Sequence, residues 1–152
     1  MDVTDNWTFL EDGTRFLMTS EQDGYNHIYL YLMDGTLVKQ LTFGEWEVTN
    51  VYGFDGKEVY FQAAKNSSIE RQIYAVNLKG EMRTLINKVG TNNARFSSNF
   101  KYLININSSV EQPHQYVLFD NKGNQVRVLE DNKEFAERMK EYNLGKKEFI
   151  TI

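Results

Sequence analysis

The sequence of 152 residues contains no cysteine and a single proline, Pro113. Without cysteine it can form neither a disulfide framework nor a thiolate metal site, and it has no cysteine nucleophile. The net charge of −4 and the scatter of the basic residues argue against nucleic-acid binding, because a phosphate-binding groove needs clustered Lys and Arg. No apolar run approaches the roughly 18 residues of a membrane span, and no basic region followed by an apolar one opens the chain. We therefore expect a cytosolic protein, or a mature or internal piece of an exported one.

The composition is that of a globular domain, with 41% hydrophobic, 14% aromatic and 25% charged residues. Short segments rich in strand-forming residues recur with a period of 43 to 45 residues. Each period opens with an apolar strand that ends in a turn former, at Phe9 and Asp12, Tyr52 and Asp55, and Phe96 and Asn99. The second strands cover residues 16–20, 59–63 and 102–106, the third strands cover residues 27–32, 72–77 and 115–119, and the fourth strands end at Leu41, Leu85 and Leu129.

A repeat of this length, built from four short strands separated by glycine-containing turns, is typical of a β-propeller blade. One four-stranded sheet cannot bury both of its faces, so neighbouring blades stack and each covers a face of the other. A β-sandwich of about twelve strands gives turns at similar intervals, but it gives no reason for a regular register. We therefore expect an all-β fold, a partial propeller of three four-stranded antiparallel blades in residues 1–43, 44–89 and 90–131.

The pattern changes after Asp131, where residues 132–152 predict a linker helix and the start of a further domain. Asn132 is a good N-cap, and Glu134 and Glu137 lie where the helix dipole favours acidic residues. The apolar positions, spaced as one helix face requires, are Phe135, Met139 and Tyr142. Gly145 is expected to end the helix, and residues 146–152 have the pattern of a strand.

Histidine and serine are the residues from which a hydrolytic site could be built. His27 and His114 hold corresponding positions before the third strand of the first and third repeats. A triad also needs a serine nucleophile, and the sequence has no Gly-x-Ser-x-Gly motif, so structural roles are favoured for both histidines. The serine pairs at 67–68, 97–98 and 108–109 fall in turns, where hydroxyls satisfy backbone groups. No catalytic residue is predicted.

Metal and cofactor sites are not indicated either. The acidic runs 21–23 and 130–131 lack the alternating oxygen ligands of a calcium loop, and the sequence has no glycine-rich phosphate loop. N-glycosylation sequons begin at Asn6, Asn66 and Asn107, a number close to chance. We predict no metal-binding residue and no cofactor.

Aromatic residues offer an alternative to a purely structural interpretation. Those that could form a sugar or peptide platform are Tyr25, Tyr29, Tyr31, Trp46 and Tyr52. Alternation places Tyr29 and Tyr31 on one face of a strand and aliphatic residues on the other, so that both faces are bulky and apolar. Stacked blades require such faces, and core packing is favoured over a ligand platform.

Five stretches of the sequence resemble the last three blades of the dipeptidyl peptidase IV propeller, in the same order and spacing. They cover residues 24–31, 41–48, 70–74, 128–132 and 147–150. The stretch 41–48, which contains Trp46, is the most specific. The last stretch is similar to the passage from that propeller into the α/β-hydrolase domain of the prolyl oligopeptidase family.

The resemblance implies an eight-bladed propeller and a serine peptidase that releases dipeptides with Pro or Ala in second position. In that family the Ser-Asp-His triad lies on the hydrolase domain, and paired Glu on an earlier blade bind the substrate's amine. Neither motif occurs here, so no catalytic or substrate-binding residue is assigned, and the chain alone should be inactive.

The partners implied by the resemblance are the hydrolase domain of the same polypeptide and, in the whole enzyme, the peptide substrate. The absence of cysteine fits a bacterial source, for which the resemblance implies a periplasmic or cell-envelope location. The alternative is a TolB-type propeller without enzymatic activity that serves as a protein-binding scaffold.

Three blades leave two outer faces uncovered, since closed propellers have about four to eight blades. Exposing even three large apolar side chains forfeits roughly 5 to 9 kcal/mol, which is comparable to the stability of a small domain. We therefore expect self-association through the open faces, or a distorted arrangement of blades. Between the first two blades, Leu41 should end an outer strand, Gly44 should permit the turn, and Trp46 should begin the next inner strand.

Overall fold

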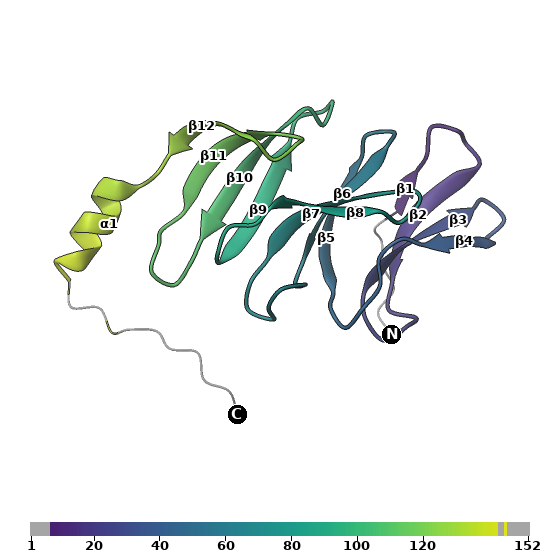
Figure 1. Ribbon diagram of the computed structural model, residues 1–152, viewed down its shortest axis with the longest axis horizontal. Coiled ribbons are helices and arrows are strands. Elements are labelled where there is room, and N and C mark those ends of the chain that lie inside the picture. The colour runs from purple at the N-terminus through teal and green to yellow at the C-terminus, as the bar shows by residue number, and fades with distance from the viewer. Residues whose placement is uncertain (1–6, 143–144, 146–152) are drawn as a thin grey trace.

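The computed structural model describes residues 7–142 and residue 145, and contains three separate four-stranded antiparallel sheets (Figure 1). The first sheet consists of β1 (Trp7–Phe9), β2 (Arg15–Ser20), β3 (His27–Leu32) and β4 (Leu37–Gln40). The second consists of β5 (Val48–Phe54), β6 (Glu58–Ala63), β7 (Gln72–Asn77) and β8 (Met82–Ile86). The third consists of β9 (Thr91–Phe96), β10 (Tyr102–Ser108), β11 (Gln115–Asp120) and β12 (Gln125–Glu130). Strands that follow one another in the chain pair within each sheet, which confirms the expected all-β partial propeller.

Short polar side chains build the turn between the first two strands of every sheet. The turn formers Asp12, Asp55 and Asn99 each accept a hydrogen bond, through Oδ1, from the backbone amide two residues further on, at 2.8, 2.8 and 3.1 Å. This local bond favours a turn over continued strand. The hairpins are therefore specified by residues that lie within the turns.

Two apolar cores lie between the sheets, one on each side of the second sheet. The core between the first and second sheets includes Leu17, Leu30, Phe61 and Tyr74, and the core between the second and third includes Tyr60, Ala75, Leu103 and Val117. The second sheet is therefore covered on both faces. The first sheet keeps one outer face, on which Trp7 and Phe9 remain 49% and 62% exposed.

The third sheet is shifted by one residue relative to the alignment of the repeats in the sequence. That alignment makes Leu103, 43 residues after Tyr60, its equivalent. Both side chains belong to the core between the second and third sheets, so they point toward each other from opposite sheets. Ile104 is therefore the true equivalent of Tyr60, because a shift of one residue moves a strand side chain to the opposite face.

The crossover from the first to the second sheet differs from the expected one in where its strands end and begin. β4 ends at Gln40, one residue before Leu41, and β5 begins at Val48 rather than at Trp46. The strand begins at Val48 because Asn26 engages that residue on both sides, with its carbonyl accepting from the Val48 amide (2.8 Å) and its Nδ2 donating to the Val48 carbonyl (2.7 Å).

The C-terminal helix α1 (Lys133–Lys140) is shorter than expected, and its ends are formed differently. Asn132 holds the N-cap position but makes no side-chain capping bond, because its backbone is left-handed (φ 52°, ψ 29°) rather than extended; its Nδ2 donates to the carbonyl of His114 (2.5 Å). The helix stops at Glu141, whose amide bonds the Arg138 carbonyl three residues back, a contact that tightens and closes the last turn. Gly145 therefore does not end the helix.

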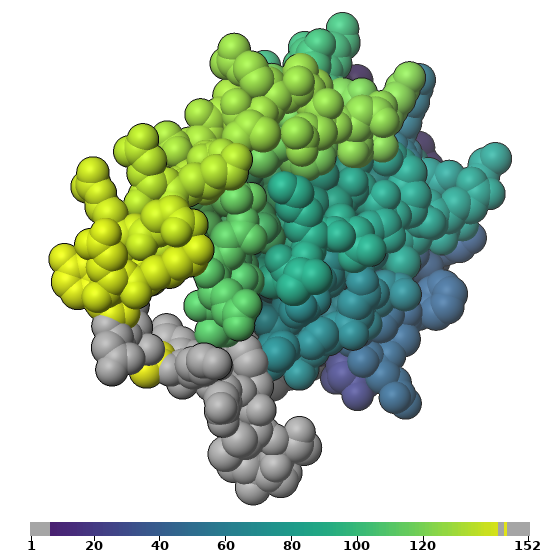
Figure 2. Space-filling view, turned by 60° about the vertical axis from the view of Figure 1, so that its left-hand side comes forward, coloured from purple at the N-terminus to yellow at the C-terminus, as the bar shows by residue number. Residues whose placement is uncertain are grey.

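No residue of α1 is buried, and its apolar positions, including Phe135 and Met139, face solvent. The helix extends away from the third sheet (Figure 1) and protrudes at one side of the molecule in Figure 2. Among the described residues no helix has the length and apolar character to cross a membrane. The strand expected in residues 146–152 lies outside the described residues.

Candidate functional site

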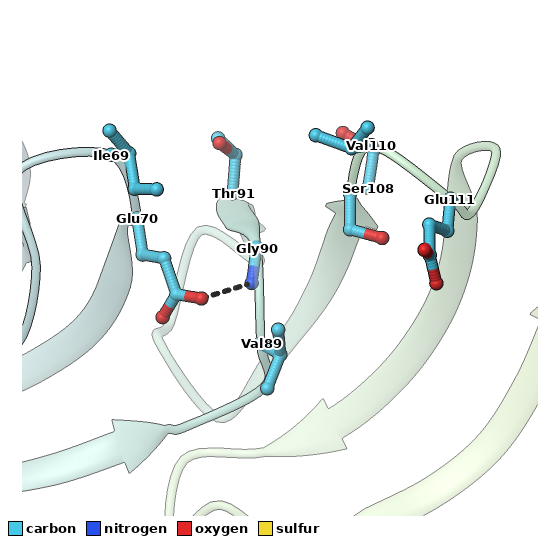
Figure 3. A pocket seen from close by; sticks show the side chains of 9 residues that line it. Ile69, Glu70, Val89, Gly90, Thr91, Ser108, Val110 and Glu111 are labelled. Carbon is cyan, nitrogen blue, oxygen red and sulfur yellow. Dashed lines mark hydrogen bonds between the residues drawn. The ribbon is translucent and has the colours of Figure 1, made fainter. Parts of the chain in front are cut away.

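A cleft of about 480 Å³ lies between the second and third sheets, at the end where the chain crosses from one sheet to the next. Three segments line it, namely residues 69–70 before β7, residues 89–91 at the crossover from β8 to β9, and residues 108–111, which begin with the last residue of β10. Figure 3 shows the side chains of Glu70 and Glu111 on opposite sides of the cleft, with the crossover between them. Segments far apart in the sequence thus form one surface.

The crossover glycine lets the walls of the cleft approach closely. Gly90 has φ of 92°, and a Cβ at this position would lie 2.3 Å from the carbonyl oxygen of Ser108. Its amide donates to Oε1 of Glu70 (3.3 Å), while Oε2 of Glu70 accepts from Nε2 of Gln72 (3.1 Å). The Glu70 carboxylate is therefore held in place by two donors, one from the crossover and one from β7.

A buried cluster of asparagines fixes the backbone near this cleft. Nδ2 of Asn92 donates to the carbonyls of Lys88 (2.6 Å) and Arg71 (2.9 Å), and its Oδ1 accepts from Nδ2 of both Asn105 (3.0 Å) and Asn107 (3.1 Å). The three asparagines belong to β9 and β10 of the third sheet, whereas Arg71 precedes β7 and Lys88 follows β8 of the second sheet. The cluster therefore joins the two sheets. Because Asn107 is buried and engaged here, its sequon is not a surface glycosylation site in this fold.

The chemistry of the cleft is that of a binding surface. Its walls carry two carboxylates, those of Glu70 and Glu111, together with the aliphatic side chains of Ile69, Val89 and Val110. Neither histidine nor cysteine nor lysine lines it, so the serines at 108 and 109 are not paired with a histidine or lysine base in this cleft. Within the described part of the chain, no group of three or more His, Cys, Asp or Glu side chains is arranged to hold a metal ion.

A second cleft, of about 320 Å³, repeats this construction one sheet earlier. It is lined by Tyr25, by residues 45–47 of the first crossover, and by residues 64–68 and Arg71 before β7. It brings acidic and basic side chains together, unlike the cleft in Figure 3, which holds carboxylates alone.

His27 holds the first crossover together from inside the protein. It is fully buried, with Nε2 2.9 Å from the carbonyl of Gly44 and Nδ1 3.1 Å from Oγ1 of Thr42. Since a carbonyl only accepts, Nε2 carries the proton, and the Thr42 hydroxyl donates to Nδ1. The same Oγ1 accepts from the amide of Ile28 (2.9 Å). These bonds use both ring nitrogens for structure.

His114 lies in another sheet and does not approach His27. It is exposed before β11, and its carbonyl accepts the bond from Asn132. The serine pairs also stay apart. Oγ of Ser97 accepts from the amide of Tyr102 (3.1 Å), as a turn residue does, whereas Ser108 is the last residue of β10 rather than part of a turn.

The five aromatic residues considered as a platform are distributed over different parts of the fold. Tyr25 and Trp46 both border the second cleft, while Tyr29 is buried in the first sheet and Tyr31 stacks on Phe16 with 5.5 Å between ring centroids. Tyr52 joins the second sheet to the third, since its hydroxyl donates to Oδ1 of Asn93 (2.9 Å) and accepts from the Ala94 amide (3.1 Å). Burial raises the pKa of Tyr52 to about 12.

The carboxylates of the cleft in Figure 3 were not predicted as a site from the sequence. Glu70 and Glu111 lie in different repeats, and each looks like an ordinary loop residue. The available signal was Gly90 at the crossover, because a glycine between two strands often marks a close approach of backbone segments.

Comparison with known sequences gives consistent matches over nearly the whole chain. Residues 1–114 match the family model described as the dipeptidyl peptidase IV (DPP IV) N-terminal region. A probable dipeptidyl peptidase 4 of Arthroderma benhamiae is 34% identical over 140 residues, covering 88% of this chain and 18% of the relative. Dipeptidyl peptidase 4 of Trichophyton rubrum is also 34% identical over 140 residues, with the same coverage.

Solved structures agree with these matches. The crystal structure of Porphyromonas gingivalis dipeptidyl peptidase 4 superposes with a TM-score of 0.87 and 42% identity, covering 95% of this chain and 21% of that one. A putative dipeptidyl aminopeptidase IV from Bacteroides ovatus gives a TM-score of 0.70 at 28% identity, covering 82% and 21%. The chain therefore spans about a fifth of the length of these relatives.

Proposed function

Since this chain belongs to the family of the dipeptidyl peptidase IV N-terminal region, we propose that it is the non-catalytic propeller portion of a serine exopeptidase that releases Xaa-Pro and Xaa-Ala dipeptides. The observation that carries the proposal is the match to the Porphyromonas gingivalis enzyme, which covers 95% of the chain at 42% identity. At that identity the resemblance concerns sequence as well as fold.

The proposed role is to wall the chamber through which small peptides reach the active site and to hold the hydrolase domain. The path of the chain supports this role. β12 ends at the same end of its sheet as β4 and β8, whose ends lead into the two crossovers. The chain after Glu130 thus leaves from the end that carries both clefts. A hydrolase domain following α1 would lie on this end.

The catalytic groups in this proposal belong to the hydrolase domain of the same polypeptide. Within the described residues, His27 is fully engaged in structural bonds and the His114 imidazole makes no hydrogen bond to a serine. This chain would contribute shape, a rigid frame and the acidic cleft near the domain boundary. This chain would form part of the chamber wall that the peptide substrate passes.

A chimaera of the Porphyromonas gingivalis enzyme tests the proposal, with this chain replacing the segment to which it corresponds. If the proposal holds, hydrolysis of Gly-Pro-p-nitroanilide should stay within about tenfold of the unmodified enzyme, a change of about 1.4 kcal/mol in the activation barrier. The unmodified enzyme is the positive control, and circular dichroism checks that the chimaera folds. A folded chimaera without activity would contradict the proposed role.

A further inference from the structure

The two clefts occupy equivalent places in the repeat, as the hydrogen bonds at the two crossovers indicate. The amide of Val48 donates to the carbonyl of Asn26 (2.8 Å), and the amide of Asn92 donates to the carbonyl of Arg71 (2.9 Å). Asn26 and Arg71 are the last residues before the third strands of their sheets, β3 and β7. Residues at the same distance in sequence from these bonded pairs can therefore be compared between the two clefts.

The cleft in Figure 3 has a carboxylate and a glycine where the second cleft has two aromatic rings. Glu70 corresponds to Tyr25, because each immediately precedes the residue whose carbonyl accepts the bond. Gly90 corresponds to Trp46, because each lies two residues before the residue whose amide donates it. The cleft without the rings is the larger of the two, with about 480 Å³ against about 320 Å³. The two crossovers share a backbone arrangement, and this cleft differs from the other in its chemistry.

Three aliphatic side chains at this cleft are exposed to solvent. Ile69, Val89 and Val110 are 52%, 76% and 45% exposed, and each comes from a different one of the three segments that line the cleft (Figure 3). Exposed apolar side chains that gather around one hollow are typical of a surface that binds the apolar part of another molecule. The lining therefore favours a ligand with an aliphatic portion.

The two carboxylates of the cleft are not neutralised by a cation of the chain. Both bonds to the Glu70 carboxylate come from neutral amides. The exposed side chain of Glu111 makes no hydrogen bond or ion pair with any residue that the structure describes. Arg71 follows Glu70 directly, but its Nη1 donates to the carbonyls of Ser68 (2.9 Å) and Glu70 (2.8 Å), and it lines the second cleft. The charge of this cleft therefore favours a cationic ligand.

Three hydroxyl groups line the cleft beside these side chains, those of Thr91, Ser108 and Ser109. None of the three makes a hydrogen bond within residues 7–142. A hydroxyl both donates and accepts, so these groups match the N–H and C=O groups of a peptide main chain. A simple alkyl diamine would leave them without partners.

We propose that this cleft binds a lysine side chain of a peptide, with the aliphatic stem on the three exposed apolar side chains and the ammonium between Glu70 and Glu111. Lysine has a four-carbon stem that packs on apolar surface, and its compact charge has three donors that can reach acceptors on both walls. The amides that hold Glu70 fix one acceptor before the ligand arrives. This inference does not depend on the proposed function, because the binding is a property of the chain alone.

NMR titration of the isotope-labelled chain tests the site, with the Gly90 amide as the reporter because it donates to the Glu70 carboxylate. We expect acetyl-Ala-Lys-Ala-amide to shift this signal in a saturable way. The matching norleucine peptide keeps the stem without the charge and should bind at least about tenfold more weakly, since bonds to a charged group are lost. The diamine 1,5-diaminopentane keeps the stem and the charge without the main chain and should also bind at least about tenfold more weakly.

Replacing Glu111 by Gln should lower the affinity for the lysine peptide at least about tenfold and leave that for the norleucine peptide unchanged. Its side chain bonds to no residue that the structure describes, so this variant should fold as the unsubstituted chain does. Glu70→Gln should have the same effect on affinity. The matched control is Glu134→Gln, exposed on α1, which should leave both affinities unchanged.

Equal binding of the lysine and norleucine peptides would overturn the proposal, because the carboxylates would then have no part in recognition. Equal binding of the diamine would show that the cleft does not recognise a peptide. A Gly90 signal that stays in place at millimolar lysine peptide would refute the site, and so would an unchanged affinity of Glu111→Gln.

Discussion

The imidazole of His27 meets the indole of Trp46 edge to face, with 4.8 Å between ring centroids and an angle of 88° between the ring planes. The indole also stacks on Phe61 of β6 at 6.5 Å, so the first crossover is packed against a strand of the second sheet. The most specific stretch of the sequence thus has a structural task. The indole of Trp46, in contact with His27 and with Phe61, fastens one blade to the next.

Replacing Trp46 by Ala should destabilise the chain by about 3 kcal/mol, at the lower end of the range for large aromatic residues because the ring is only half-buried. Urea unfolding followed by circular dichroism measures the change. Phe43→Ala is the matched control, since Phe43 lies in the same crossover but is 71% exposed, and its loss should cost less than about 0.5 kcal/mol. Equal effects of the two changes would show that the indole does not join the sheets.

Replacing Gly90 by Ala should destabilise the chain by more than about 2 kcal/mol, because the positive φ strains any L side chain and the added methyl meets the Ser108 carbonyl. Gly13→Ala is the control, with φ of 64° and open space around it, and should cost only about 1 kcal/mol. Thermal unfolding of both variants measures the difference. A Gly90→Ala protein as stable as Gly13→Ala would mean that the cleft walls can move apart freely.

Stability should depend on Tyr52 at alkaline pH. Its pKa is about 12 in the folded chain and 10.0 as the ordinary value, so the neutral hydroxyl is favoured by folding. The stabilisation is fully present below pH 10 and is lost as the pH rises through 12. We expect the stability difference between the unsubstituted chain and Tyr52→Phe to shrink over this window. Other tyrosines titrate in both proteins and cancel, so a constant difference would contradict the expectation.

The purified chain of 152 residues should show no hydrolysis of Gly-Pro-p-nitroanilide. The reason is that the histidines of the described region are structural or isolated, and that the nucleophile motif is missing from the sequence. A full-length dipeptidyl peptidase IV assayed in parallel is the positive control. Turnover that persists after a further purification step and copurifies with the chain would refute this prediction.

The fold was predictable because the residues that form the strands and turns recur in every repeat. Asp12, Asp55 and Asn99 form the expected turns, and the strands β3 and β7 have the predicted bounds. The repeat alignment did not predict correctly on which face of the third sheet the residues of β10 lie. Leu103 and Ile104 are both strand-forming aliphatic residues, so the residue types alone do not reveal a register shift of one residue.

The helix end and the cleft escaped prediction for a different physical reason. Asn132 has the side chain of a good N-cap, but its backbone is left-handed, and its Nδ2 is bonded to the carbonyl of His114, 18 residues away in sequence. Glu70 and Glu111 come together only once two sheets have packed. Contacts between segments that are distant in sequence decide both features, and no local sequence pattern indicates such contacts.

Because the second sheet is buried on both faces, we expect it to unfold after the other two. Each blade touches only its neighbours, so the chain resembles a short one-dimensional array in which end units are held by one interface and the middle unit by two. Opening the third sheet breaks a single core, whereas opening the second breaks both. Amide hydrogens of β6 and β7 should therefore exchange with solvent last, as the array frays from its ends toward its centre.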